Sequence, residues 1–178
     1  MDKAAAALQQ LQQADVPVLW RPFHEFDGDW FWWGRGGPRN FVKLWRIMYT
    51  RYTDDWGLNN LIWVAGHQAR PWTAELWYPG DGYVDIAGAD SYYGGTQAWL
   101  YKRIQLFIGN RKPICFHENG SIPDMDALQL WGADWVWFMT WHTDWIMDEQ
   151  YNTKAHLYEV YNIDYAITLD ELPDFTAR

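Results

Sequence analysis

Short apolar runs recur along the chain, and most are followed by a stretch in which apolar residues repeat every three or four positions. The runs are continuous and do not alternate with polar residues, which is the pattern of strands buried on both faces of a parallel sheet. The sequence therefore predicts five strands, at residues 16–20, 61–65, 84–88, 113–116 and 135–140.

The stretches outside the strands have the spacing of amphipathic helices, at residues 3–15, from Asn40 as a cap to before Gly57, from about Thr96 to 108, at 125–131 and at 154–161. Alternating strands and helices indicate a parallel α/β sheet with right-handed crossovers. No linker or internal repeat interrupts the series, so we expect residues 1–178 to form one domain.

Polar and aromatic residues gather directly after four of the predicted strands. In a barrel-type sheet the carboxyl ends of the strands share one face, and that face holds the active site. We therefore expect these residues to lie near one another: Arg21, His24, Glu25, Asp90, Tyr92, His117, Glu118, Trp141 and His142.

Trp30 to Trp33 form a dense aromatic stretch that follows Gly28. Indole rings stack on the apolar C–H faces of sugars, so this stretch fits a carbohydrate cleft. The alternative interpretation is an ordinary core segment. The chain holds 15 Trp and 11 Tyr, more than a core of this size needs, and this excess favours an aromatic-lined cleft.

Glu25 and Glu118 each follow a predicted strand and could act together on a glycosidic bond. A retaining mechanism needs its two carboxyl groups about 5–5.5 Å apart, and an inverting one roughly 6.5–9.5 Å. The aromatic wall would keep Glu25 protonated as the acid, leaving Glu118 as an ionised nucleophile that accepts a hydrogen bond from Tyr92. The alternative is that both are surface glutamates at strand ends.

Other classes of function fit the chain poorly. Its 14 basic and 23 acidic residues give a net charge of −9 without a basic run, which argues against nucleic acid or an anionic membrane as partner. No apolar run approaches the roughly 20 residues of a membrane span. The zinc motif HExxH fails at Gly28, and no metal is expected. Cys115, the single cysteine, cannot form an internal disulfide.

Several of these segments together resemble glycoside hydrolase family 26, whose members are mainly β-mannanases. Residues 21–34, RPFHEFDGDWFWWG, are similar to the acid/base motif of that family. Three later segments resemble its following motifs in the same order: residues 77–93, residues 117–124 (HENGSIPD) and residues 136–146 (VWFMTWHTDWI).

The resemblance implies an eight-stranded (β/α) barrel with a retaining mechanism and no catalytic cofactor. Glu25 would be the general acid/base and Glu118 the nucleophile. The positions that would contact sugar are Arg21, His24, Trp30, Tyr92 and Trp141. The resemblance also implies secretion, although no signal peptide follows Met1 and localisation cannot be read from the chain.

The chain differs from the family in length, because a complete barrel has about 250 residues. If Glu25 ends the fourth barrel strand, the chain corresponds to the C-terminal five-eighths, a truncated TIM-type barrel of about five βα units. We expect a retaining hydrolase of β-1,4-mannan or a related β-linked hemicellulose. The alternative is a non-catalytic carbohydrate-binding half-barrel that uses the Trp-rich cleft. The first and last strands would have open apolar edges, so we also expect a homodimer.

Overall fold

The computed structural model describes residues 1–68 and 71–174 and contains one five-stranded parallel sheet in the order β1-β2-β3-β4-β5. The strands are β1 (Val18–Trp20), β2 (Leu61–His67), β3 (Ile86–Ser91), β4 (Ile114–Asn119) and β5 (Phe138–Thr140). Each strand pairs in parallel with the next along the chain. The predicted number, order and direction of the strands are confirmed.

Helices precede and separate the strands. They are α1 (Asp2–Gln13), α2 (Gly37–Thr50), α3 (Ala74–Trp77), α4 (Ala98–Ile108), α5 (Met125–Trp131), α6 (Asp144–Met147) and α7 (Lys154–Val160). Shorter helical turns lie at Arg51–Asp55, Pro71–Thr73, Asp81–Tyr83 and Leu169–Glu171. Among the described residues, none of these helices has the length and apolar character needed to cross a membrane.

Several predicted boundaries are wrong. Asn40 does not cap α2, because the helix already begins at Gly37 with Pro38 in its first turn, where the missing N–H costs nothing. The predicted strands 84–88 and 113–116 begin and end too early. As a result Asp90 lies within β3, and His117 and Glu118 lie within β4.

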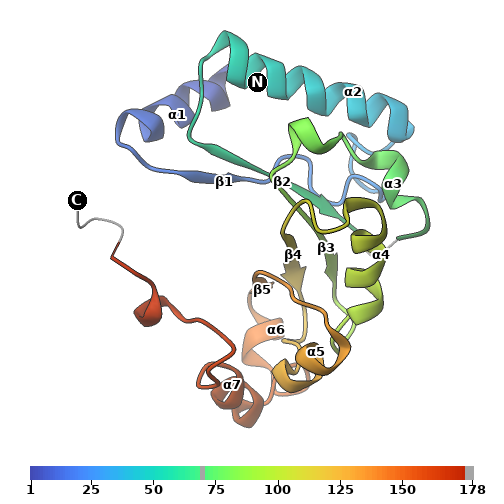
Figure 1. Cartoon of the computed structure of the whole chain (residues 1–178), viewed down its shortest axis with the longest axis vertical. Helices are drawn as coiled ribbons and strands as arrows, with labels where there is room; N and C mark the ends of the chain where they lie inside the picture. Colours follow the sequence, from blue (N-terminus) through green and yellow to red (C-terminus); the bar gives the residue numbers. More distant parts are fainter. Residues whose placement is uncertain (69–70, 175–178) are drawn as a thin grey trace.

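The sheet curves as part of a barrel wall, and helices cover its outer side (Figure 1). Helices α1 and α2 lie beside β1 and β2, and α4 packs on β3 and β4. The segment after α7 runs back along the opposite, open side of the sheet (Figure 1). The observed architecture is therefore a half-barrel of five parallel strands.

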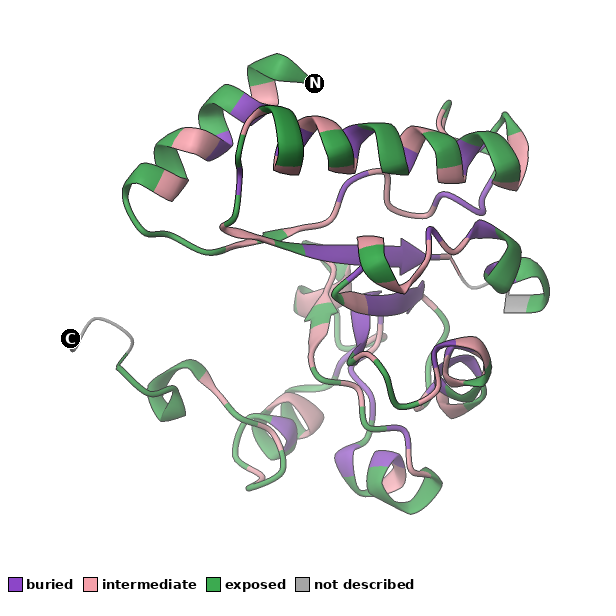
Figure 2. Ribbon diagram, turned by 45° about the horizontal axis from the view of Figure 1, so that its top comes forward, coloured by how far each residue is buried: buried purple, intermediate pink, exposed green. Residues whose placement is uncertain are grey.

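The core divides into two clusters on the helix side of the sheet. Trp45 of α2 and Trp63 of β2 belong to the first, and Ile104 of α4 and Ile114 of β4 belong to the second. Figure 2 shows the central strands as the most continuously buried part of the chain. The prediction that the first strand is buried on both faces is wrong. Leu19 of β1 is 56% exposed, because β1 has only one strand neighbour among the described residues.

Candidate active site

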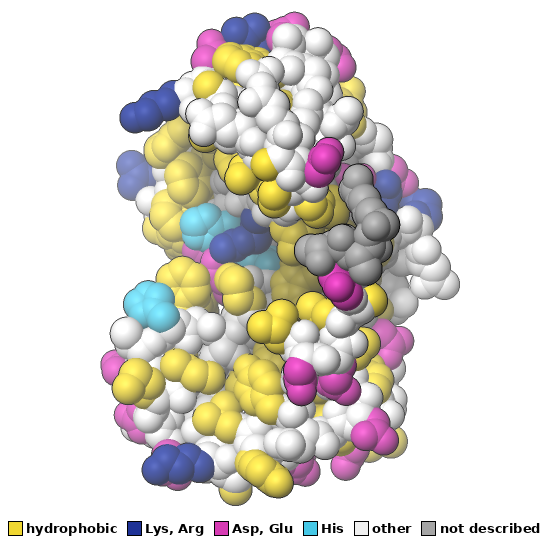
Figure 3. All heavy atoms as spheres, turned by 90° about the vertical axis from the view of Figure 1, so that its left-hand side faces the viewer, with side chains coloured by type: hydrophobic (Ala, Val, Ile, Leu, Met, Phe, Trp, Pro, Cys, Tyr) yellow, Lys and Arg dark blue, Asp and Glu magenta, His cyan; other side chains and the backbone are white. Residues whose placement is uncertain are grey.

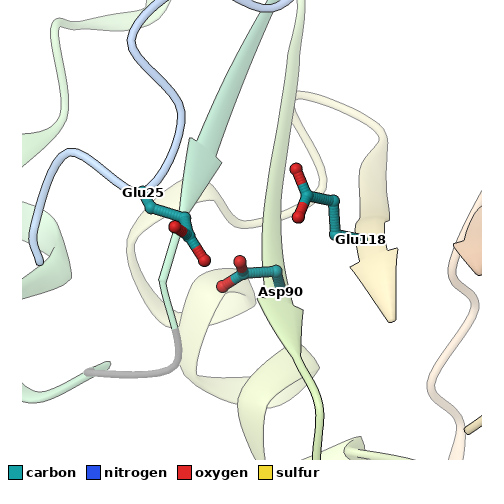
Figure 4. A group of neighbouring side chains, drawn as sticks. All are labelled: Glu25, Asp90 and Glu118. Atoms are coloured by element: carbon teal, nitrogen blue, oxygen red, sulfur yellow. The ribbon is translucent and has the colours of Figure 1, made fainter. Parts of the chain in front are cut away.

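The open side of the half-barrel is hollowed, and histidine and basic side chains lie within the hollow between hydrophobic ones (Figure 3). Three carboxyl groups meet at this end of the sheet. Glu25 lies in the loop after β1, Asp90 near the end of β3 and Glu118 near the end of β4. One oxygen of each lies within 4.8 Å of the others. Figure 4 shows the three side chains converging.

Strand register places Asp90 beside Glu118. The two residues are paired across β3 and β4, directly after an irregularity between Ala89 and Asp90. Partners on neighbouring strands point to the same face of a sheet, and such irregularities re-aim side chains. The two carboxyl groups are nearly fully buried.

Glu25 reaches the cluster from a tightly constrained loop. Its backbone has φ of +53°, a conformation uncommon outside glycine, and its N–H donates to the Gly66 carbonyl at 2.8 Å. Trp30 donates its indole N–H to Oε2 of Glu25 at 2.8 Å. Gly28 makes room for this indole, since a Cβ there would lie 2.6 Å from the Trp30 ring. Two hydrogen bonds therefore orient Glu25, one donated by its backbone N–H and one accepted by its side chain.

Glu118 has two close partners. Tyr92 donates its phenolic hydrogen to Oε2 at 2.7 Å, as expected from the sequence. Arg21 Nη1 lies 2.7 Å from Oε1, a close ion pair, and His24 Nε2 is 3.9 Å from the same oxygen. Burial first, and then the hydrogen bond to Glu118, raise the pKa of Tyr92, so the phenol keeps the hydrogen that it donates.

His117 holds Arg21 in place. Its Nδ1 lies 3.0 Å from Arg21 Nη1, and its Nε2 lies 3.0 Å from the backbone oxygen of His67. Burial and then the Arg21 charge lower the pKa of His117 well below its ordinary value, which leaves a neutral imidazole. A guanidinium can only donate, so Nδ1 accepts and Nε2–H donates to His67. Gly66 provides the space, because a Cβ there would lie 2.6 Å from Nε2.

Asp90 differs from the other two carboxyl groups, because neither of its oxygens receives a hydrogen bond from a donor among the described residues. Burial first, then a hydrogen bond with Glu25 and the charges of Glu25, Glu118 and Asp27, raise the pKa of Asp90 to about 10. Arg21, beside Glu118, already supplies a positive charge to this cluster, and we assign no metal to it.

The aromatic stretch divides between cleft and core. Trp30 and Trp32 are exposed, whereas Phe31 and Trp33 are half-buried and stack on each other with centroids 4.3 Å apart. Trp33 also donates its indole N–H to the His24 carbonyl at 2.9 Å. The stretch is therefore partly buried and partly exposed, and its interpretation as a carbohydrate cleft stays a prediction.

The family assignment rests on a match that covers nearly the whole chain. The model of glycosyl hydrolase family 26 matches residues 1–171. The chain belongs to this family. Membership confirms the resemblance found in the motifs, and the parallel half-barrel agrees with the family 26 structures described next.

Similar proteins include mannan endo-1,4-beta-mannosidases. The chain is 40% identical to a mannan endo-1,4-beta-mannosidase of Thermothelomyces thermophilus, over 97% of this chain and 35% of that protein. It is 39% identical to mannan endo-1,4-beta-mannosidase B of a Piromyces species, over 100% of this chain and 30% of that protein. The chain thus spans about a third of the length of these relatives.

Solved structures share the fold. The GH26-CBM35 beta-(1,4)-mannanase of Podospora anserina is 42% identical with a TM-score of 0.90, over 97% of this chain and 38% of that one. A beta-mannanase from a symbiotic protist of the termite Reticulitermes speratus, complexed with gluco-manno-oligosaccharide, is 36% identical with a TM-score of 0.89. That match covers 96% of this chain and 52% of the other.

In this family 26 chain the structure brings most of the predicted site residues together. Arg21, His24 and Tyr92 surround Glu118, and Trp30 contacts Glu25. Trp141 joins through Tyr92, with ring centroids 6.4 Å apart. The sequence prediction gave no role in the site to Asp90 or His117. Their position near the ends of predicted strands could have indicated a place in the site. Their burial and their hydrogen-bond partners could not be read from the hydrophobic pattern of the sequence.

Proposed function

We propose that this chain carries the catalytic groups of a retaining glycoside hydrolase that cleaves β-1,4-mannan or a related β-linked hemicellulose. The observation that carries the proposal is the approach of Glu25 and Glu118, with one oxygen of each within 4.8 Å of the other. Retaining enzymes hold their two carboxyl groups about 5–5.5 Å apart, whereas inverting enzymes leave room for a water molecule at roughly 6.5–9.5 Å.

In this mechanism Glu118 attacks the anomeric carbon while Glu25 gives its proton to the departing glycosidic oxygen. The products of this step are a glycosyl ester on Glu118 and an ionised Glu25. Glu25 then takes a proton from water, whose oxygen attacks the anomeric carbon and releases Glu118. Arg21 and Tyr92, both at 2.7 Å from Glu118, orient the nucleophile and balance its charge.

The substrate-binding residues that we propose are Arg21, His24, Trp30, Tyr92 and Trp141. Trp30 has two functions in this account, because its exposed ring can stack on a sugar while its N–H orients Glu25. The relatives named above as mannosidases support mannan as the substrate class.

We also propose that residues 1–178 act as one truncated barrel domain and associate as a homodimer. Exposed apolar residues at both open edges support this, among them Leu19 on β1, Val136 before β5 and Met139 on β5. Light scattering coupled to size exclusion should report about twice the 21.2 kDa chain mass. A monomer at every protein concentration would overturn the dimer without affecting the catalytic assignment.

A second candidate function is carbohydrate binding without turnover. The open side of the half-barrel favours it, because a misplacement of catalytic groups by about 1 Å can cost about 10²-fold in rate. The deciding experiment measures reducing-sugar release from mannans, glucans and xylans by the parent chain and by Glu118→Gln. Release from mannan that disappears in Glu118→Gln supports the hydrolase. Binding of mannan with no release by either protein supports the binding module.

A further inference from the structure

Asp90 is a buried acid with no conventional partner. It is 1% exposed, and neither of its oxygens accepts a hydrogen bond from a donor in the described part of the chain. Two other carboxyl groups, those of Glu25 and Glu118, lie close to it, with oxygens within 4.8 Å. An ionised carboxylate in such a position would lack both solvent and a counter-charge, and burying a charge in that way is strongly unfavourable.

The charged and titratable groups around Asp90 do not offset the cost of burying it as a carboxylate. From β1 and its loop come Arg21, Glu25 and Asp27, and of these the guanidinium of Arg21 is directed to Glu118 and His117. Asp27 accepts from the Gln68 N–H at 2.7 Å and faces His67 Nδ1 of β2 at 3.6 Å.

Strand β4 contributes Glu118 and His117, and β3 is followed by Tyr92. Glu118 is paired with Arg21, and the phenolic hydrogen of Tyr92 is already donated to Glu118. His117 is a neutral imidazole whose two nitrogens are occupied by Arg21 and His67. Among the described residues of these elements, none donates a hydrogen bond to Asp90 and none forms an ion pair with it.

We propose that Asp90 stays protonated at neutral pH and donates its carboxyl hydrogen to Glu25, which makes it a positioning residue for the proposed acid/base. This inference rests on the function proposed above for Glu25. Separately, the hydrogen bond between the two side chains and burial raise the pKa of Asp90 to about 10, in agreement with the geometry.

The proton balance of the reaction is unchanged by Asp90. Glu25 alone gives a proton to the leaving oxygen and regains one from water, while Asp90 keeps its own proton throughout. When Glu25 is ionised between the two steps, its charge is met by the indole N–H of Trp30 and the hydroxyl of Asp90. Glu118 is esterified at that point, so the cluster holds one carboxylate, that of Glu25, beside the guanidinium of Arg21.

The first test is independent of catalysis and measures urea-induced unfolding of the parent and of Asp90→Asn. The folded parent holds a proton on Asp90 that the unfolded chain releases, so its unfolding free energy falls as pH rises from the unfolded value toward about 10. Asparagine cannot titrate. Between about pH 5 and pH 9, the ratio of the unfolding constants of parent and variant should rise by up to about tenfold per pH unit. A ratio that stays constant with pH would overturn the inference.

A second measurement on the parent alone covers the case in which Asp90→Asn does not fold. Infrared spectra of the chain labelled with ¹³C-aspartate should contain the carbonyl band of a protonated carboxylic acid at neutral pH, lost only near pH 10. The same spectra without that band at neutral pH would contradict the inference.

Activity provides the third test. Asp90→Asn keeps a donor at the same place and should retain at least about tenfold more kcat than Asp90→Ala, since a lost hydrogen bond to a charged group costs about that factor. Equal losses in both variants would contradict a donor role. If the parent releases no sugar while its unfolding behaves as stated, the proposed function fails and the protonation of Asp90 stands. If the parent is active but the unfolding ratio is constant with pH, the proposed function stands and the protonation of Asp90 is refuted.

Discussion

The phenolic oxygen of Tyr92 lies 2.7 Å from Oε2 of Glu118 and donates a hydrogen bond to it. In the proposed mechanism this bond orients the nucleophile. Tyr92→Phe should lower kcat by about 10- to 100-fold, because a hydrogen bond to a charged group contributes about 1.5–3 kcal/mol. Initial rates on mannan measure the loss. Tyr93→Phe is the matched control, since the Tyr93 side chain is 77% exposed, and equal losses in the two variants would exclude this role.

Replacing Glu25 tests its two proposed functions separately: the acid that assists formation of the glycosyl ester and the base that assists its hydrolysis. Glu25→Ala should lose most activity on mannan, yet should form the glycosyl ester readily from substrates with an activated leaving group, which needs no acid. Added azide, which needs no base, should then restore turnover. Glu159→Ala, on the exposed side of α7, is the control and should behave as the parent. Failure of both rescues would contradict the assignment of Glu25.

Substitutions of Trp30 and Trp45 compare an exposed tryptophan of the proposed cleft with a buried tryptophan of the core. Trp30→Ala should weaken binding of manno-oligosaccharides while lowering the melting temperature only slightly, since its ring is 41% exposed. Trp45→Ala should cost about 3–5 kcal/mol of unfolding free energy, because that ring is fully buried. Calorimetry of binding and of unfolding measures both. A collapse of the fold in Trp30→Ala would show that this residue belongs to the core.

His117 makes the fold sensitive to acid. Its pKa in the folded chain lies well below 6.5, so the unfolded chain binds a proton there that the folded chain does not. The contribution of His117 to the unfolding free energy is therefore present above about pH 6.5 and is lost as pH falls below it. His117→Gln should be less stable at neutral pH but should lose less of its stability on acidification. His142→Gln, at an exposed histidine, should keep the slope of the parent. Parallel slopes for all three proteins would contradict this.

The sequence predicted the strands and their order because continuous apolar runs mark buried parallel strands, and β2, β3 and β4 fit that pattern closely. It failed at the open edges, where the same apolar pattern occurs in β1 and β5 but each has only one neighbouring strand in the described part of the chain. Leu19 is the clearest case, an apolar strand residue that is mostly exposed.

Within the site, residue types near strand ends were enough to identify the two glutamates and Tyr92 as candidates. Asp90 and His117 were expected at this face but without a role, because their properties arise from burial and strand register, which a short motif does not contain. Burial is the main cause of the raised pKa of Asp90, and Glu25 adds to it from a loop with positive φ, a backbone that nothing in the pattern around Glu25 predicts.

The most direct test of the account is covalent trapping of the nucleophile. A 2-deoxy-2-fluoro-β-mannobioside with an activated leaving group slows release of the glycosyl ester more than its formation. Intact mass spectrometry of the full chain should then find one added glycosyl group, and peptide mapping should locate it on Glu118. No label should form on Glu118→Gln. A parent chain that remains unlabelled, or that carries the label on Glu25 or Asp90, would contradict the proposed mechanism.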